Sequence, residues 1–484
     1  MNNEIRPQKP AYKTEAQAVA MLEELELKTG LYKYRIDDYS AWRLLRFKMS
    51  LVLQHLPFSS SSKSSRFTWA MERLVYFFRE IPVFLFPQHK NILVKTFSTA
   101  LGEEENGFYK DIHFDDLFDG SDTCFKIEAL NNPNYAERRE KALIPITMTT
   151  AVFDLLSAAF AFIKIPTYTR RVASDIYRDI QSEFDGLALT AKGIQVSLLM
   201  FYWSKRLYKW LLFRIKPKIV LSADTGEFSL WAASRELGIP VVEFQHGVFT
   251  RGHPDALNST MGAYRNHLII PNKIFLYGEY WRKQLLLNQY YQGELVTVGN
   301  PRIDRYRAIR KNILTPDSNS DTSILLTSQG LDLERLIEFL SEFVYIANSK
   351  LKYSLCIKLH PAERDRSIYV KTLGKYPRVK ILYGFEKPST FELFAKADLH
   401  ISIASASHYD SIGLFVPTVV LPLAGHELVQ HLVDEGHAHL VKTPKDLVDL
   451  ASNIRDLKVT EEVSHYYYEP NALQNIKREM GRLI

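Results

Sequence analysis

Short β-rich runs alternate with helical stretches over most of this chain, and that alternation limits the possible folds more than any other feature. One series of runs lies at residues 92–96, 125–129, 218–222, 241–244, 273–277 and 295–298, and a second at 324–327, 354–359, 379–383, 398–402, 418–421 and 439–441. Strands that alternate with helices are typical of βαβ units in a parallel sheet. We therefore predict an α/β protein with two doubly wound, Rossmann-like domains that face each other across a cleft.

Length and local composition predict where these domains begin and end. At roughly 100–200 residues per domain, a chain of 484 residues suits two or three domains. We expect an N-terminal helical region over residues 1–90, a first Rossmann-like domain over 91–308 and a second over 323–484. The polar residues 309–322 are expected to link the two, and SSSSKSS at 59–65 has the composition of a flexible linker.

Residues 67–80 mix aromatic and basic side chains, among them Arg73, Phe78 and Arg79. A helix of this composition suits an interfacial position on acidic lipid. A helix packed on the first domain explains the same residues. The sequence leaves both interpretations open.

Charge and cysteine content exclude several classes of function. The 61 Lys and Arg residues exceed the 55 Asp and Glu residues by 6, a mild excess that suits phosphorylated substrates or an anionic membrane surface. No nucleic-acid-binding motif accompanies it, so we expect no nucleic acid partner. Cys124 and Cys356 cannot supply a disulfide framework or a cysteine zinc site.

No stretch reaches the roughly 18 apolar residues of a membrane span, so we expect a cytoplasmic protein, at most peripheral on the inner face of the membrane.

Four polar segments follow predicted strands, at the edge where open parallel sheets bind ligands. They are Asp224 with Glu227, the tripeptide Gln245-His246-Gly247, the KLHP sequence at 358–361, and the serine-rich residues 402–410. We expect these segments to contribute to one site.

The last two of these segments are suited to bind phosphate. A histidine at a strand end, mounted on a following proline and near a lysine, can donate to a phosphate oxygen. Serines before a helix can cap it or join its backbone N–H groups around an anion, and an acid in its first turn can hold the loop or meet a sugar hydroxyl. The predicted phosphate-binding residues are His360, Pro361, Lys358, Ser405, Ser407 and Asp410.

The first two segments offer candidates for a general base. Asp224 or Glu227 could take a proton from an acceptor hydroxyl, although a turn residue and a helix-dipole partner explain them as well. His246 competes for the same role, and Gly247 after it would let the backbone come close to a ligand. Gln245, Asn300 and Arg302 are predicted to lie nearby in the cleft.

No metal ion is predicted. Asp115, Asp116 and Asp119 could bind a divalent cation, but acids in a turn explain them more simply, and Asp37 with Asp38 has the same two interpretations. The sequence contains no GxxxxGK loop, no GxGxxG after a strand, no HExxH and no GxSxG.

Four short motifs together resemble bacterial glycosyltransferases of the two-domain GT-B fold that build capsules and other surface polysaccharides. They are EFQHGV at 243–248, VGNPRID at 298–304, KLHP at 358–361 and SASHYDSIGLFVPTVV at 405–420. An HP motif followed by a serine motif looks like the nucleotide-phosphate site of enzymes that use CMP-activated acidic sugars such as sialic acid or Kdo. The same motifs are similar to teichoic-acid glycerophosphotransferases that use CDP-glycerol, whose proposed base matches His246-Gly247. The acid-acid-Gly base motif of polysialyltransferases is missing, which leaves the base and the donor open.

This resemblance implies transfer of a sugar from a nucleotide-activated donor to a glycan or lipid-linked glycan, without a metal ion or cofactor. Phosphate-binding side chains would stabilise the leaving nucleotide. The alternatives are polyol-phosphate transfer or sugar-nucleotide epimerisation on the same fold, or a non-catalytic subunit of a polysaccharide assembly complex.

Overall fold

The chain divides into two compact units. The computed structural model describes residues 15–54, 66–97, 101–103, 109–118, 124–129, 148–184, 187–223, 226–249, 264–287, 293–313, 321–360, 363, 366–384 and 386–484. The first unit consists of Met1–Leu276, Arg282–Val296 and Lys477–Ile484, and the second of Tyr277–Trp281 and Thr297–Ile476. The predicted linker residues 59–65 lie outside the described residues.

A seven-stranded sheet forms the centre of the first unit, in the order β11-β10-β9-β8-β3-β6-β7. Strand β3 pairs in parallel with both β6 and β8, so the chain starts in the middle, builds one side and then crosses to the other. The reversal therefore falls between β3 and β8. The strands are β3 (Ile92–Thr96), β6 (Cys124–Glu128), β7 (Met148–Thr149), β8 (Ile219–Ser222), β9 (Val241–Phe244), β10 (Lys273–Leu276) and β11 (Glu294–Thr297).

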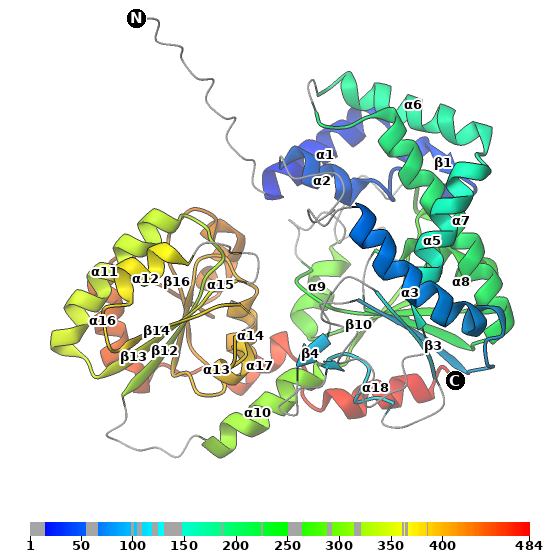
Figure 1. The fold of residues 1–484 in the computed structure, drawn as a ribbon. Helices are drawn as coiled ribbons and strands as arrows, with labels where there is room; N and C mark the ends of the chain where they lie inside the picture. Colours follow the sequence, from blue (N-terminus) through cyan, green and yellow to red (C-terminus); the bar gives the residue numbers. More distant parts are fainter. Residues whose placement is uncertain are drawn as a thin grey trace, which may run out of the picture. The chain divides into compact units, whose positions relative to one another are not determined.

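The N-terminal helices belong to the core of this first unit. Leu22 and Trp42 share one buried cluster with Leu93, Phe125 and Val220 of the sheet. Figure 1 shows α3 beside α5, which packs in turn on α7. The helices are α1 (Glu15–Thr29), α2 (Arg46–Leu53), α3 (Arg66–Leu85), α5 (Ala151–Ile163), α6 (Thr167–Gln181), α7 (Ala191–Ile215), α8 (Phe228–Glu236) and α9 (Glu279–Leu286). The two small hairpins are β1 (Arg35–Ile36) with β2 (Tyr39–Ser40), and β4 (Leu101–Glu103) with β5 (Tyr109–Asp111).

Asp37 occupies the turn between β1 and β2 with a positive φ of 51°. Its carboxylate accepts from Lys205 at 2.6 Å, Arg206 at 3.2 Å and the Tyr168 hydroxyl at 2.9 Å. These contacts fix the turn on α6 and α7, which agrees with the turn interpretation of this acid.

A six-stranded sheet forms the centre of the second unit, in the order β14-β13-β12-β15-β16-β17 with every neighbouring pair parallel. Here the direction reverses between β12 and β15. The strands are β12 (Thr322–Thr327), β13 (Tyr353–Lys358), β14 (Val379–Leu382), β15 (Leu399–Ser402), β16 (Thr418–Val420) and β17 (His439–Leu440). The helices are α10 (Pro301–Ile313), α11 (Leu333–Lys350), α12 (Ser367–Leu373), α13 (Thr390–Phe394), α14 (Ser407–Gly413), α15 (Gln430–Asp434), α16 (Pro444–Ser452) and α17 (Glu461–Tyr467), followed by α18 (Ala472–Gly481).

Both sheets confirm the predicted α/β class with two doubly wound, Rossmann-like domains. In each, the first strand lies in the interior, the next two build one side and the later strands build the other. The central strands are buried along their length, as parallel strands covered on both faces must be. This explains the short apolar runs at 92–94 and 219–221.

Helix α10 belongs to the second unit, whereas the sequence analysis placed residues 301–308 in the first domain. Two arginines account for the difference. The Arg310 guanidinium donates to the carbonyls of Phe394 and Ala397 at 3.1 and 2.6 Å. Arg307 donates to the Gly413 carbonyl at 2.7 Å and the Tyr468 carbonyl at 2.9 Å. The helix is therefore bonded to α13, α14 and α17, which a reading of local composition could not show.

In the part of the chain that the structure describes, no helix alone has the length and apolar composition of a membrane span. One pair, α5 with α6, meets both requirements when taken together, and it is bent by 96°.

Candidate functional site

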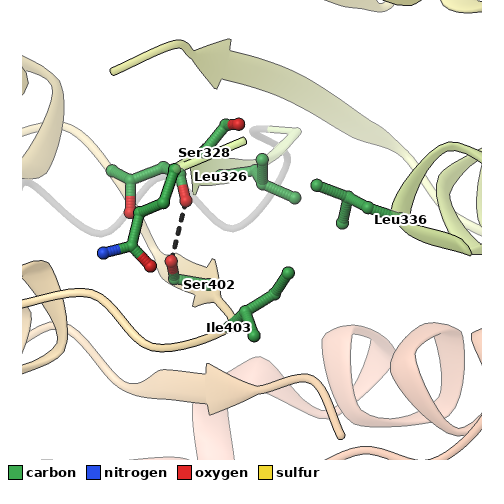
Figure 2. A pocket seen from close by; sticks show the side chains of 7 residues that line it. Leu326, Ser328, Leu336, Ser402 and Ile403 are labelled. Atoms are coloured by element: carbon green, nitrogen blue, oxygen red, sulfur yellow. Dashed lines mark hydrogen bonds between the residues drawn. The ribbon is translucent and has the colours of Figure 1, made fainter. Parts of the chain in front are cut away.

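The chain reversal of the second unit brings polar residues together at the carboxyl ends of β12 and β15. Figure 2 shows the side chains around a shallow hollow there, which leaves essentially no room for a water molecule. The Ser402 hydroxyl donates to the Thr327 carbonyl at 2.7 Å. Ligands of open α/β sheets bind at such a reversal point. The hollow is lined by Leu326, Thr327, Ser328, Gln329, Leu336, Ser402 and Ile403.

Ser328 lines this hollow and is not among the residues predicted from the sequence. Its hydroxyl donates to Glu363 Oε2 at 2.6 Å and is bonded to the Tyr369 hydroxyl at 2.7 Å, and Tyr369 donates to Glu363 Oε1 at 2.9 Å. Burial raises the pKa of Tyr369 and keeps its proton in this triangle. The sequence signal for Ser328 was a pair of polar residues directly after β12, followed by Gly330, which has a φ of 70° in the turn.

The serine-rich segment forms the start of α14, as predicted. The Ser405 hydroxyl accepts from the Ser407 backbone N–H at 3.1 Å and lies 2.7 Å from the Ser407 hydroxyl. Ser405 is buried and holds the turn into the helix, whereas Ser407 is half-buried and is the more accessible of the two.

Asp410 holds the surrounding structure. The Tyr468 hydroxyl donates to its carboxylate at 2.6 Å. Burial raises the pKa of Asp410, while Tyr468 and the positive charge of Arg302 oppose that shift. The loop-holding role weighed for this acid is the one its contacts favour.

In the KLHP segment, Lys358 is buried and His360 is exposed. The buried Lys358 ammonium donates to the backbone carbonyls of Tyr383 at 2.9 Å and Pro388 at 3.2 Å, and to that of Glu386, so it fixes the loop after β14. Burial lowers the pKa of Lys358. His360 is exposed at the end of β13, and its carbonyl accepts from the Glu363 N–H at 2.9 Å, which directs Glu363 back toward Ser328. Pro361 lies outside the described residues.

In the first unit, Glu227 and the Gln245-His246-Gly247 segment follow neighbouring strands. Glu227 precedes α8 and forms an ion pair with Lys95, which lies on β3 at the reversal point. Gln245 is buried and its amide donates to the Gly247 carbonyl at 2.7 Å. The half-buried His246 ring contacts Phe97, with centroids 5.4 Å apart. Asp224 lies outside the described residues.

Asn300 and Arg302 lie in the second unit. The Asn300 side-chain oxygen accepts from the Arg302 N–H at 2.9 Å and so caps α10, and the Arg302 guanidinium lies over the Phe391 ring, 3.8 Å from its centroid. These contacts give both residues a structural task, and Arg302 also places a cation near Asp410.

Of the acids considered as cation ligands, Asp115 pairs with a buried lysine, together with Asp111 and Glu128. Lys126 Nζ lies 3.1 Å from Asp111, 2.5 Å from Asp115 and 3.2 Å from Glu128. Among the described residues, no group of three or more His, Cys, Asp and Glu side chains is arranged to hold a metal ion. Asp119 lies outside the described residues.

No protein-family model matches the chain, and no curated protein sequence matches it. Among solved structures, it is similar to the UDP-GlcNAc 2-epimerases of Methanocaldococcus jannaschii (15% identity, TM-score 0.48) and Neisseria meningitidis (14%, 0.49), over 81% of this chain and 99% of each of those. It is also similar to Acinetobacter baumannii MurG, with 15% identity and a TM-score of 0.44 over 82% of this chain and all of the other. Because these sequence identities and TM-scores are low, the fold assignment rests on the strand orders described above.

Two histidines behind the hollow form a buried hydrogen-bonded network. His400 on β15 is bonded to the Thr327 hydroxyl at 2.9 Å and the Thr418 hydroxyl at 2.8 Å, and His408 on α14 reaches the same Thr418 hydroxyl at 2.7 Å. Burial lowers the pKa of His400 well below its usual value and that of His408 to about 3. Both rings are therefore neutral at pH 7.

We expect the free energy of unfolding to fall as pH drops below 6.5, because the two histidines then bind protons in the unfolded chain but stay neutral in the folded protein. The stabilising contribution of the neutral His408 ring is fully present above pH 6.5 and is lost between pH 6.5 and about pH 3. Each ring contributes about 1.4 kcal/mol per pH unit in that window. In His408→Gln, the free energy of unfolding should change less steeply with pH by this amount. Denaturant titrations at several pH values would measure it. The exposed His360→Gln serves as control, and an unchanged slope in His408→Gln would contradict the assignment.

Proposed function

We propose that this protein is a glycosyltransferase that moves a sugar from a nucleotide-activated donor to a hydroxyl of a glycan or lipid-linked glycan in bacterial surface polysaccharide synthesis. The observation that carries the proposal is the reversal point of the second unit, where Ser328, His360 and Ser407 follow three adjacent strands. Open α/β sheets bind nucleotides at this place. The order of the four motifs supports the same activity.

In this proposal, the second unit binds the nucleotide and stabilises its leaving phosphate. His360 and Ser407 are accessible donors, and donors fixed before the reaction act where negative charge develops. Lys358, Ser405 and Asp410 shape the site through the loop after β14, the start of α14 and Tyr468. These side chains and backbone N–H groups supply the charge stabilisation, so the proposed mechanism uses neither a metal ion nor a cofactor.

The first unit supplies the base in this proposal. The Glu227 carboxylate is engaged in an ion pair with Lys95. Of the described candidates we therefore propose His246, with Gly247 giving the acceptor close access to backbone. The base would take the proton of the acceptor hydroxyl as the glycosidic bond forms and the nucleotide leaves.

The donor we propose is a CMP-activated acidic sugar, supported by the HP motif followed by serines. The His246-Gly247 pair favours one second candidate, glycerophosphate transfer from a CDP-glycerol-type donor. Product analysis separates the two, because only the second leaves a phosphodiester in the product. A change in the sugar nucleotide without any acceptor would instead identify an epimerase.

Replacing His360 by alanine is expected to lower the rate of transfer by about 100- to 1000-fold, the usual loss of one donor to developing charge. The side chain is exposed, so the fold should persist, as far-UV circular dichroism can check. A nucleotide that binds the native state raises its thermal midpoint. A screen of CMP, CDP, UDP, GDP and dTDP should therefore show a shift with a cytidine nucleotide that His360→Ala reduces.

His465→Ala, on α17 of the same unit, is the matched control and should retain activity and the shift. Full activity of His360→Ala would overturn the assignment of this residue. A thermal shift with UDP alone would overturn the cytidine donor and leave the rest of the proposal in place.

A further inference from the structure

The outer face of α3 is apolar and exposed. Side chains on this face recur at intervals of three and four residues, the spacing of one helix face, and Val75, Phe78 and the following Phe86 are 67%, 70% and 76% exposed. The opposite face is buried, with Arg73 bonded to Asp154 at 3.0 Å. Within the described residues, the outer face is left to solvent. Its exposed apolar residues are Met71, Leu74, Val75, Phe78, Leu85 and Phe86.

The exposed apolar surface continues onto the end of α7. The Phe84 ring stacks on Trp210 with centroids 4.6 Å apart. The Lys90 N–H donates to the Ile215 carbonyl at 3.4 Å, which brings the residues after α3 to the end of α7, where Phe213 is 65% exposed. We call the six residues of the outer face together with Trp210 and Phe213 the α3–α7 surface. Figure 1 shows α3 lying along this side of the first unit, beside α5 and close to α7.

The charged side chains that the structure describes as exposed along α3 and the end of α7 have one sign. Among the described side chains of residues 71–90 and 210–218, every exposed charged group is basic: Arg79, Arg214, Lys216 and Lys218. The acid Glu80 is buried and accepts from the Thr149 hydroxyl at 2.7 Å. A second copy docked by a two-fold contact would bring these basic groups against themselves. An anionic surface complements them.

We propose that the α3–α7 surface docks on a bilayer that contains anionic phospholipid. Large exposed apolar patches mark interaction sites. A helix with an apolar outer face and basic neighbours lies in the plane of the headgroups, with its apolar side chains among the acyl chains and its cations near lipid phosphates. The proposal does not rest on the proposed function, because the surface uses none of the candidate catalytic or phosphate-binding residues.

Vesicle flotation tests the proposal with the full chain. The wild type is expected to float with vesicles of phosphatidylcholine and phosphatidylglycerol and to bind vesicles of phosphatidylcholine alone more weakly. The variant Val75→Ser/Phe78→Ser/Phe86→Ser should bind the anionic vesicles at least about tenfold more weakly than the wild type, because binding scales with the apolar area inserted. Arg79→Glu should weaken only the binding to anionic vesicles, and added salt should reduce that component.

The matched control is Leu27→Ser/Tyr345→Ser, at two side chains that are 75% and 76% exposed and do not belong to this surface. It should bind as the wild type does, and circular dichroism should show that every variant is folded. Three results would overturn the proposal. They are a wild type that binds neither vesicle, a triple variant that binds as well as the wild type, and a dimer in sedimentation that the triple variant abolishes without any vesicle binding.

Discussion

Replacing Lys126 by methionine is expected to lower the free energy of unfolding by about 3–5 kcal/mol, the cost of breaking a buried ion pair from one side. Burial disfavours the charge on Lys126, but the attraction of Asp111, Glu128 and Asp115 outweighs it and raises the pKa of the ammonium. Without the lysine, three buried carboxylates face one another with no cation. Denaturant unfolding followed by circular dichroism would measure the loss.

The pH dependence identifies the cause of that loss. With the cation gone, the pKa values of the buried carboxylates should rise above those of the unfolded chain, so the native state gains protons as pH falls and the deficit should shrink toward pH 5. The control is Lys28→Met, at an exposed lysine that pairs with Glu24 at 2.9 Å, and it should change stability little. A deficit that grows on acidification would contradict this account.

Replacing Gly299 by alanine is expected to cost about 4 kcal/mol or more, because backbone strain and overpacking add. Gly299 has a φ of 90°, and a Cβ there would lie 2.1 Å from the Glu469 carbonyl oxygen and 2.8 Å from the Ala472 Cβ. The glycine of the VGNPRID motif is therefore needed for a close approach of two backbone segments. Thermal and denaturant unfolding of the variant would measure the cost.

Gly436 provides a matched control in the same unit. It has a φ of 73°, and a Cβ added there meets nothing within 4 Å. Gly436→Ala should therefore cost only the strain of a left-handed alanine, about 1–2 kcal/mol. Equal losses in the two variants would show that the contact with Glu469 contributes nothing.

The fold class could be predicted from the sequence because buried parallel strands leave a signal that is local. A run such as 219–222 is buried at every position and apolar at the first three, and the helix after it is followed by Gly238, which has a φ of 70°. The start of α14 is local too, since the serines that precede it offer hydroxyls to its first N–H groups.

The task of a side chain could not be predicted where its partners are distant in the sequence. Lys358 looked like a phosphate ligand, yet it is bonded to carbonyls 25 to 30 residues further on. Ser328 was missed because its partner Glu363 lies 35 residues away. Glu227 is paired with a lysine 132 residues before it. Polar residues at strand ends mark where a site is, but tertiary contacts decide what each one does.

The order in which the chain is made matters for the first unit. Residues 477–484 belong to that unit although they follow the whole of the second. Domains generally fold one after another during synthesis, the N-terminal one first. Here the first unit is complete only when a segment made after the second unit has been added, so the second unit can fold while the first is still incomplete.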